Sequence, residues 1–84
     1  MYHWTGSNNS TYLRAPRTAS TKLAATREAM QFLRGELMGE GRIVVGTMDE
    51  GRINPDIIIE RSIHTQYRCI RQENGKEPRT MPWK

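Results

Sequence analysis

The chain has 84 residues, which gives room for one small domain and excludes a second. Its strongest core-forming residues are few, namely four Leu, seven Ile, two Val and one Phe. This content borders on that of disordered chains, but a net charge of +4 is too small to hold the chain open. We therefore expect one folded domain over residues 1–84. Because its core is small, we expect part of its apolar surface to be buried against a second copy or a partner.

Charge and cysteine content narrow the class of protein. Ten of the 13 basic residues are Arg, whose planar fork of donors suits phosphate, carboxylate and base edges, although GC-rich coding produces the same bias without a function. Cys69 is the only cysteine, which excludes an intramolecular disulfide and a Cys-rich metal site. No apolar run has the length of a signal or membrane segment. We expect a cytoplasmic protein, in its own cell or in a host cell, without a membrane partner.

Two short segments are predicted before the first clear element. Residues 5–11 are all small and polar, which is typical of a loop or mobile arm. Residues 11–15 predict a short strand that ends at Pro16, because proline has a fixed φ and no backbone donor.

An amphipathic helix is the clearest predicted element. Thr18 or Ser20 can cap its start, and Gly39 supplies the left-handed residue that stops it after Met38. Gly35 falls inside this helix and indicates close approach of another backbone. A helical period places one broad apolar face on Leu23, Ala25, Ala29, Met30, Phe32, Leu33 and Leu37.

After the helix the hydrophobic period changes from helical to alternating. The pattern predicts strands over residues 42–48, 57–64 and 67–71, with turns at 49–52, 54–56 and Asn74–Gly75. Thr65 and Gln66 form either a turn or part of one long strand. The tail over residues 77–84 contains two prolines and is at best an edge strand. The fold class is α+β in the order β-α-β-β-β, with one helix on one face of a small antiparallel sheet and the other face open.

The open face is the predicted functional surface. If Thr65 and Gln66 are a two-residue turn, Glu60 lies opposite Arg71 and His64 opposite Tyr67. This arrangement gives either an ordinary cross-strand ion pair or a surface of cations and rings that can neutralise phosphates and stack on bases.

Further arginines extend the predicted binding surface. Arg27 and Arg34 are seven residues apart and share one stripe of the helix. The candidate residues for binding nucleic acid or another anionic partner are Arg27, Arg34, Arg61, Arg68, Arg71, Tyr67 and His64.

Aromatic residues lie at both ends of the chain. Tyr2, Trp4 and Trp83 either pair the termini as neighbouring strands and complete the core, or anchor a partner protein, since Trp and Tyr dominate interface energetics.

The chain offers no plausible catalytic set. Its only histidines, His3 and His64, stand in no metal-binding spacing, and Cys69 with His64 is a poor pair of nucleophile and base because five positions separate them. We expect no enzymatic activity, no cofactor and no metal.

Two functions follow from these features. The first is a small basic module that binds nucleic acid or a ribonucleoprotein complex through its arginine and aromatic surface. The second is an inhibitor or regulator that binds a host protein through a sheet edge and the aromatic termini. In size and layout the chain resembles the short regulators and host-defence inhibitors of phages, with which it shares no motif. A homodimer is a further expected state.

Overall fold

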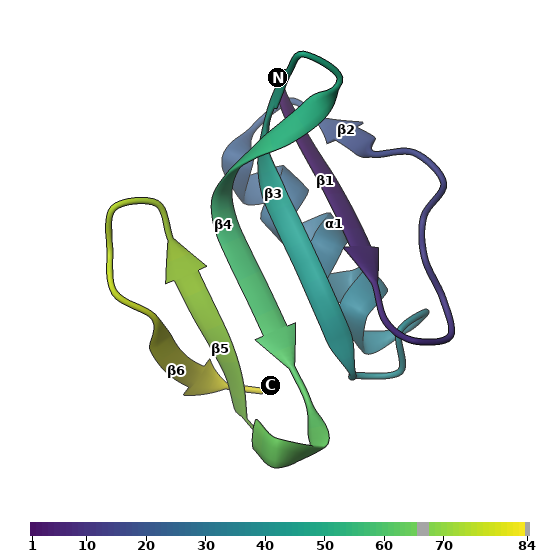
Figure 1. Cartoon of the computed structure of the whole chain (residues 1–84), viewed down its shortest axis with the longest axis vertical. Coiled ribbons are helices and arrows are strands. Elements are labelled where there is room, and N and C mark those ends of the chain that lie inside the picture. The colour runs from purple at the N-terminus through teal and green to yellow at the C-terminus, as the bar shows by residue number, and fades with distance from the viewer. Residues whose placement is uncertain (66–67, 84) are drawn as a thin grey trace.

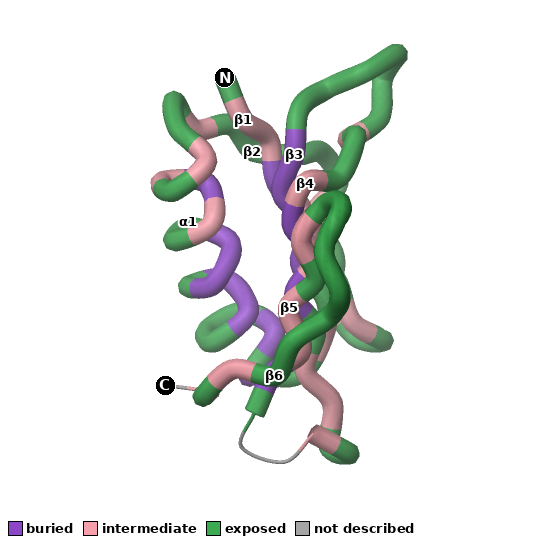
Figure 2. Tube along the Cα trace, turned by 90° about the vertical axis from the view of Figure 1, so that its left-hand side faces the viewer, coloured by how far each residue is buried: buried purple, intermediate pink, exposed green. Residues whose placement is uncertain are grey.

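In the computed structural model, which describes residues 1–65 and 68–83, one helix packs on a six-stranded antiparallel sheet (Figure 1). The sheet order is β2-β1-β3-β4-β5-β6. The elements are β1 (Tyr2–Ser7), β2 (Arg17–Ala19), α1 (Lys22–Arg34), β3 (Gly41–Asp49), β4 (Arg52–Arg61), a 3₁₀ turn (Ile63–Thr65), β5 (Arg68–Glu73) and β6 (Arg79–Pro82). The predicted α+β class is confirmed, and the helix covers one face of the sheet while the other stays open (Figure 2).

The helix is shorter than its apolar pattern predicts. Thr21 is the N-cap, and its hydroxyl accepts a hydrogen bond of 3.0 Å from the backbone amide of Ala24. Gly35 is the C-cap and lies outside the helix, where its amide donates to the carbonyl of Gln31 at 2.9 Å. The chain then turns irregularly to Gly39, whose φ of 78° matches the predicted left-handed stop.

The prediction for the N-terminal segment was wrong. Residues 2–7 form β1, which lies between β2 and β3, whereas the predicted strand over residues 11–15 supplies only an isolated bridge between Ser7 and Tyr12. Gly6 is small because β1 packs closely on the core, where an added Cβ would lie 3.0 Å from both Ile43 and Phe32. In the sequence, a glycine that permits close packing of a strand has the same signal as a glycine in a loop.

The predicted turn at residues 54–56 was also wrong, because β4 continues through it. Pro55 pairs with Gly46 at a β-bulge, and β5 joins β4 only from Ile57 onward. Pro55 therefore occupies a stretch of β4 that has a strand on one side only, where proline is tolerated. Gly46 is required there, because an added Cβ would lie 2.0 Å from the carbonyl oxygen of Asn54.

The register between β4 and β5 differs by one residue from the predicted one. Glu60 pairs with Ile70, and Arg71 lies opposite Ile59. The connection is longer than a two-residue turn, because β4 ends at Arg61 and a 3₁₀ turn follows. Relative to β4, a shift of one residue exchanges the faces of all side chains of β5. Arg71 therefore lies on the helix side with Ile59, and the predicted pair of Glu60 and Arg71 does not form.

The core lies between α1 and strands β1, β3, β4 and β5 (Figure 2). Its fully buried large side chains are Trp4, Leu33, Leu37, Ile43, Val45, Ile57, Ile59 and Cys69. The termini are not neighbouring strands as predicted, since β1 is internal and β6 forms the far edge. No helix in the described part of the chain is long and apolar enough to cross a membrane.

Candidate functional site

Two arginines from distant parts of the chain meet over one tryptophan. Arg34 at the end of α1 and Arg61 at the end of β4 place their guanidinium carbons 5.5 and 4.4 Å from the ring centroid of Trp83. Arg34 also donates a hydrogen bond of 3.3 Å to the carbonyl of Trp83, and Arg61 donates one of 2.7 Å to the carbonyl of Gly39. Both guanidinium groups lie within the distance of a cation–π interaction, so Trp83 is held beside the helix.

A second group of cations lies on the adjoining strands. Arg71 and Arg79 are cross-strand neighbours on β5 and β6, and both approach the carboxylate of Glu73, at 3.2 and 3.6 Å. Lys76 lies 3.9 Å from the same carboxylate. The hydrogen bond from Arg71, followed by the charge of that guanidinium, holds the pKa of Glu73 below its usual range. One ionised carboxylate thus organises three cations.

Cys69 is a buried residue close to both groups of cations, since charges from each group act on its thiol. Its side chain is fully buried, and burial raises the pKa of its thiol, while the charges of Arg34, Arg61 and Arg71 oppose that rise. The thiol therefore stays protonated and acts as a small apolar residue. We call the surface formed by Arg34, Arg61, Arg71, Arg79 and Trp83 the arginine–tryptophan surface.

The structure places the other predicted nucleic-acid-binding residues apart from this surface or on its border. Arg27 is exposed on the same helical stripe as Arg34, about 10 Å further along the axis. Arg68 is exposed on the open face of the sheet, and His64 is exposed in the 3₁₀ turn. Tyr67 lies outside the described residues.

The aromatic residues proposed as partner anchors fall into different environments. Trp4 is only 1% exposed and its indole N–H donates to Glu28 at 3.1 Å, so Trp4 belongs to the core and offers nothing to a partner in this structure. Tyr2 is partly buried and packs against that core. Trp83 is also partly buried, but its ring lies beside the guanidinium groups of Arg34 and Arg61.

Sequence reasoning missed Arg79. The signal that bears on it is the Asn74–Gly75 turn, because a hairpin at this point places β6 beside β5. The loop spans residues 74–78, and this length brings Arg79 opposite Arg71. Pro78 and Pro82 argued against a fully paired strand in the tail, so the sequence did not place Arg79 beside β5.

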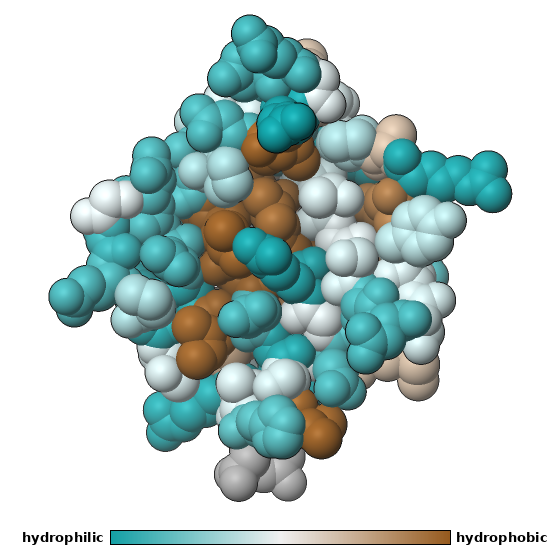
Figure 3. Space-filling view, viewed as in Figure 1, coloured by the Kyte–Doolittle hydropathy of each residue, from teal (hydrophilic) through white to brown (hydrophobic). Residues whose placement is uncertain are grey.

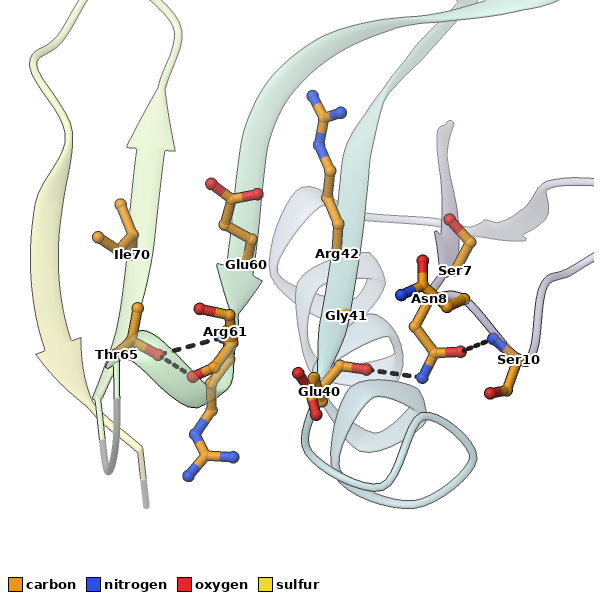
Figure 4. Close-up of a pocket in the computed structure, with 12 residues that line it drawn as sticks. Ser7, Asn8, Ser10, Glu40, Gly41, Arg42, Glu60, Arg61, Thr65 and Ile70 are labelled. Carbon is orange, nitrogen blue, oxygen red and sulfur yellow. Dashed lines mark hydrogen bonds between the residues drawn. The ribbon is translucent and has the colours of Figure 1, made fainter.

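The open face of the sheet differs from the arginine–tryptophan surface. Its centre is apolar, as the brown area in Figure 3 shows, and consists of Val44, Ile58 and Ile70. A shallow groove of about 540 Å³ crosses one end of this face, where Arg42 and Glu60 stand out from neighbouring strands (Figure 4). The described strand residues of this face include no Trp, Tyr or Phe, and Tyr67, the aromatic residue predicted for the sheet surface, lies outside the described residues.

Comparison of the chain with protein-family models, curated proteins and solved structures finds no match. Within residues 1–65 and 68–83, no three His, Cys, Asp or Glu side chains gather closely enough to hold a metal ion.

Proposed function

We propose that this protein binds single-stranded nucleic acid through the arginine–tryptophan surface. The observation that carries the proposal is the convergence of Arg34 and Arg61 on one partly buried indole, while Arg71 is near enough to act with them on the buried thiol of Cys69. The formal net charge of +4 agrees with an anionic partner, and this surface concentrates cations from four separate elements.

The chemistry of this surface suits a flexible strand that presents both bases and phosphates. Guanidinium planes and indole rings stack on bases of any sequence, and guanidinium donors contact phosphate oxygens. The exposed members, Arg34 and Arg79 (64% exposed in its side chain), are the first that a strand meets. Glu73 does not repel the strand strongly, because three cations already surround its carboxylate.

Duplex DNA fits the molecule less well. Readers of the major groove insert a helix or a two-stranded ribbon into it. The hairpin of β3 and β4 is the segment that projects from the sheet (Figure 1), but its tip carries two carboxylates, Asp49 and Glu50, against one cation, Arg52. Carboxylates at this position repel phosphates, which favours a single strand as the ligand.

The alternative, a protein inhibitor that acts through a sheet edge and aromatic termini, has less support from the geometry. One edge strand, β2, has three residues and follows Pro16, and the other, β6, ends at Pro82. Short edges and prolines hinder the addition of a strand from a partner. Trp4, one of the proposed anchors, is buried.

The test is a titration of fluorescein-labelled single-stranded RNA, single-stranded DNA and duplex DNA, followed by fluorescence anisotropy from about 50 to about 300 mM salt. If a single strand makes about four phosphate contacts, a plot of the logarithm of the binding constant against the logarithm of the salt concentration has a slope of about −3. We expect Arg34→Glu with Arg79→Glu to lower the affinity at least about tenfold and to make this slope shallower by about 1.4.

The matched control is Arg14→Glu with Arg52→Glu, which changes the net charge equally at two exposed positions outside the surface. Its affinity should stay within about threefold of the wild type, because screening at these salt concentrations limits the reach of a charge to about 10 Å. Equal losses in both variants, or no binding by the wild type at the lowest salt concentration, would contradict the proposal.

Tryptophan emission gives a second readout. Trp4 is buried, whereas Trp83 lies on the proposed surface, so bound nucleotide should change the emission of Trp83. The change should disappear in Trp83→Phe, and a change that persists in this variant would place the ligand elsewhere.

A further inference from the structure

The open face of the sheet carries an apolar strip that no segment of the described chain covers. Val44, Ile58 and Ile70 stand on neighbouring strands β3, β4 and β5, and each is partly buried by its neighbours within the sheet. The helix lies on the other side (Figure 2), and Figure 3 shows the strip in the middle of the face rather than at its margin. An apolar strip at the centre with polar residues around it is the layout of a protein interface.

Two opposite charges stand beside this strip without pairing. Arg42 and Glu60 are direct cross-strand partners on β3 and β4 and both are exposed. Neither side chain makes a hydrogen bond or ion pair with any described residue, and Figure 4 shows them on neighbouring strands with no dashed line to either. Among the described residues, Arg42 and Glu60 thus present an unpaired cation and an unpaired anion in adjacent positions of this face.

We propose that a second copy of this chain covers the open face, and that the two sheets pack face to face about a two-fold axis. The axis lies in the plane between the two sheets, runs parallel to the strands, and passes over the line that separates β3 from β4. Rotation about it places β3 of one copy over β4 of the other. Because Arg42 and Glu60 share one register position, Arg42 of each copy then faces Glu60 of the other. By the same operation Val44 faces Ile58 across the interface in both directions.

The size of the face agrees with a stable dimer. The two longer dimensions of the molecule are 34 and 29 Å, and an ellipse of these axes, the largest flat area that the face can offer, measures about 770 Å². A standard interface buries about 800 Å² on each partner, and two sheets pack about 10 Å apart with their strands nearly aligned. The edges of the sheet do not offer another mode of self-association, since β2 is short and β6 contains Pro82.

The dimer leaves both arginine–tryptophan surfaces free, because they lie on the helix side of the sheet (Figure 2). A dimer therefore presents two outward-facing basic surfaces. The dimer itself does not depend on the proposed binding of nucleic acid, and its test contains none.

The test is sedimentation equilibrium of the purified chain from about 5 to about 500 µM, a range in which even a dimer with a dissociation constant in the micromolar range, the weak end for interfaces of this size, is populated. We expect the wild type to dimerise within this range. Arg42→Glu and Glu60→Arg each place two like charges opposite one another at both symmetry-related contacts. Each variant should raise the dissociation constant of the dimer at least about tenfold. The double variant with both changes restores opposite charges and should dimerise within about threefold of the wild type.

A matched pair of apolar-to-charged variants gives a second readout. Ile58→Lys places a charge in the middle of the strip and should leave the chain monomeric, whereas Leu23→Lys changes an apolar side chain on α1 that is 61% exposed and should leave the dimer intact. Circular dichroism at each loading concentration verifies that the variants are folded. A wild type that is monomeric at the highest concentration overturns the proposal, and so does a double charge variant that dimerises as poorly as the single ones.

Discussion

Replacement of Gly46 by alanine tests the bulge that lets β4 pass through Pro55. The added Cβ would lie 2.0 Å from the carbonyl oxygen of Asn54 and 2.8 Å from its carbonyl carbon. Both atoms belong to the backbone of the paired strand, which cannot rotate away as a side chain does. The strands must separate by more than 1 Å, which breaks ladder hydrogen bonds next to the bulge.

The expected loss of unfolding free energy is at least about 3 kcal/mol, at the upper end of the range for overpacked sites. A chain of 84 residues has a total stability of about 4 to 13 kcal/mol. With a urea dependence of about 1 kcal/mol per molar, the unfolding midpoint of Gly46→Ala should fall by about 3 M, or the variant should be unfolded in water.

The control is Gly51→Ala in the turn between β3 and β4. Gly51 has a φ of 83° and no heavy atom within 4 Å of an added Cβ, so alanine there meets only conformational strain, of about 1 kcal/mol. Urea unfolding followed by circular dichroism measures both variants. If Gly46→Ala is as stable as Gly51→Ala, the close approach of Asn54 to Gly46 is not a constraint and the reasoning is wrong.

Two further predictions concern groups in and beneath the arginine–tryptophan surface. Cys69 should be inert to a thiol reagent such as dithionitrobenzoate in native buffer and react fully in urea, because its side chain is buried and its pKa is raised; fast native reaction would show that the site opens. The lowered pKa of Glu73 stabilises the folded state above the ordinary value of 4.5, and this contribution disappears as the pH falls through the folded pKa. Thermal unfolding of Glu73→Gln should therefore depend less steeply on pH below 4.5 than that of the wild type, and parallel curves would argue against the ion pairs.

Some elements could be predicted from the sequence because their signals are local. The period of Leu33 and its apolar neighbours predicted a helix, and alternation predicted the strand that became β3. The Asn74–Gly75 turn was correctly predicted, since glycine at this position adopts a φ of 78° that other residues avoid. These features depend on backbone geometry within a few residues.

The candidate surface could be predicted only in part. Arg34, Arg61 and Arg71 were singled out for their residue type, but Arg61 and Arg71 were expected among the residues of the predicted open sheet surface. Alternation along β4 puts Arg61 on the helix side together with Ile57 and Ile59, and the pairing of β4 with β5, one residue away from the predicted register, puts Arg71 there. No local pattern encodes the length of the connection between β4 and β5.

The sequence by itself determined that this chain forms one helix on a sheet, with a small core and an excess of arginine. Only the tertiary structure decided which strands are neighbours, which face each arginine occupies, and that Trp83 contacts two of them. The physical reason is that period and turn chemistry act over a few residues, whereas register and strand order depend on pairing between residues far apart in the chain.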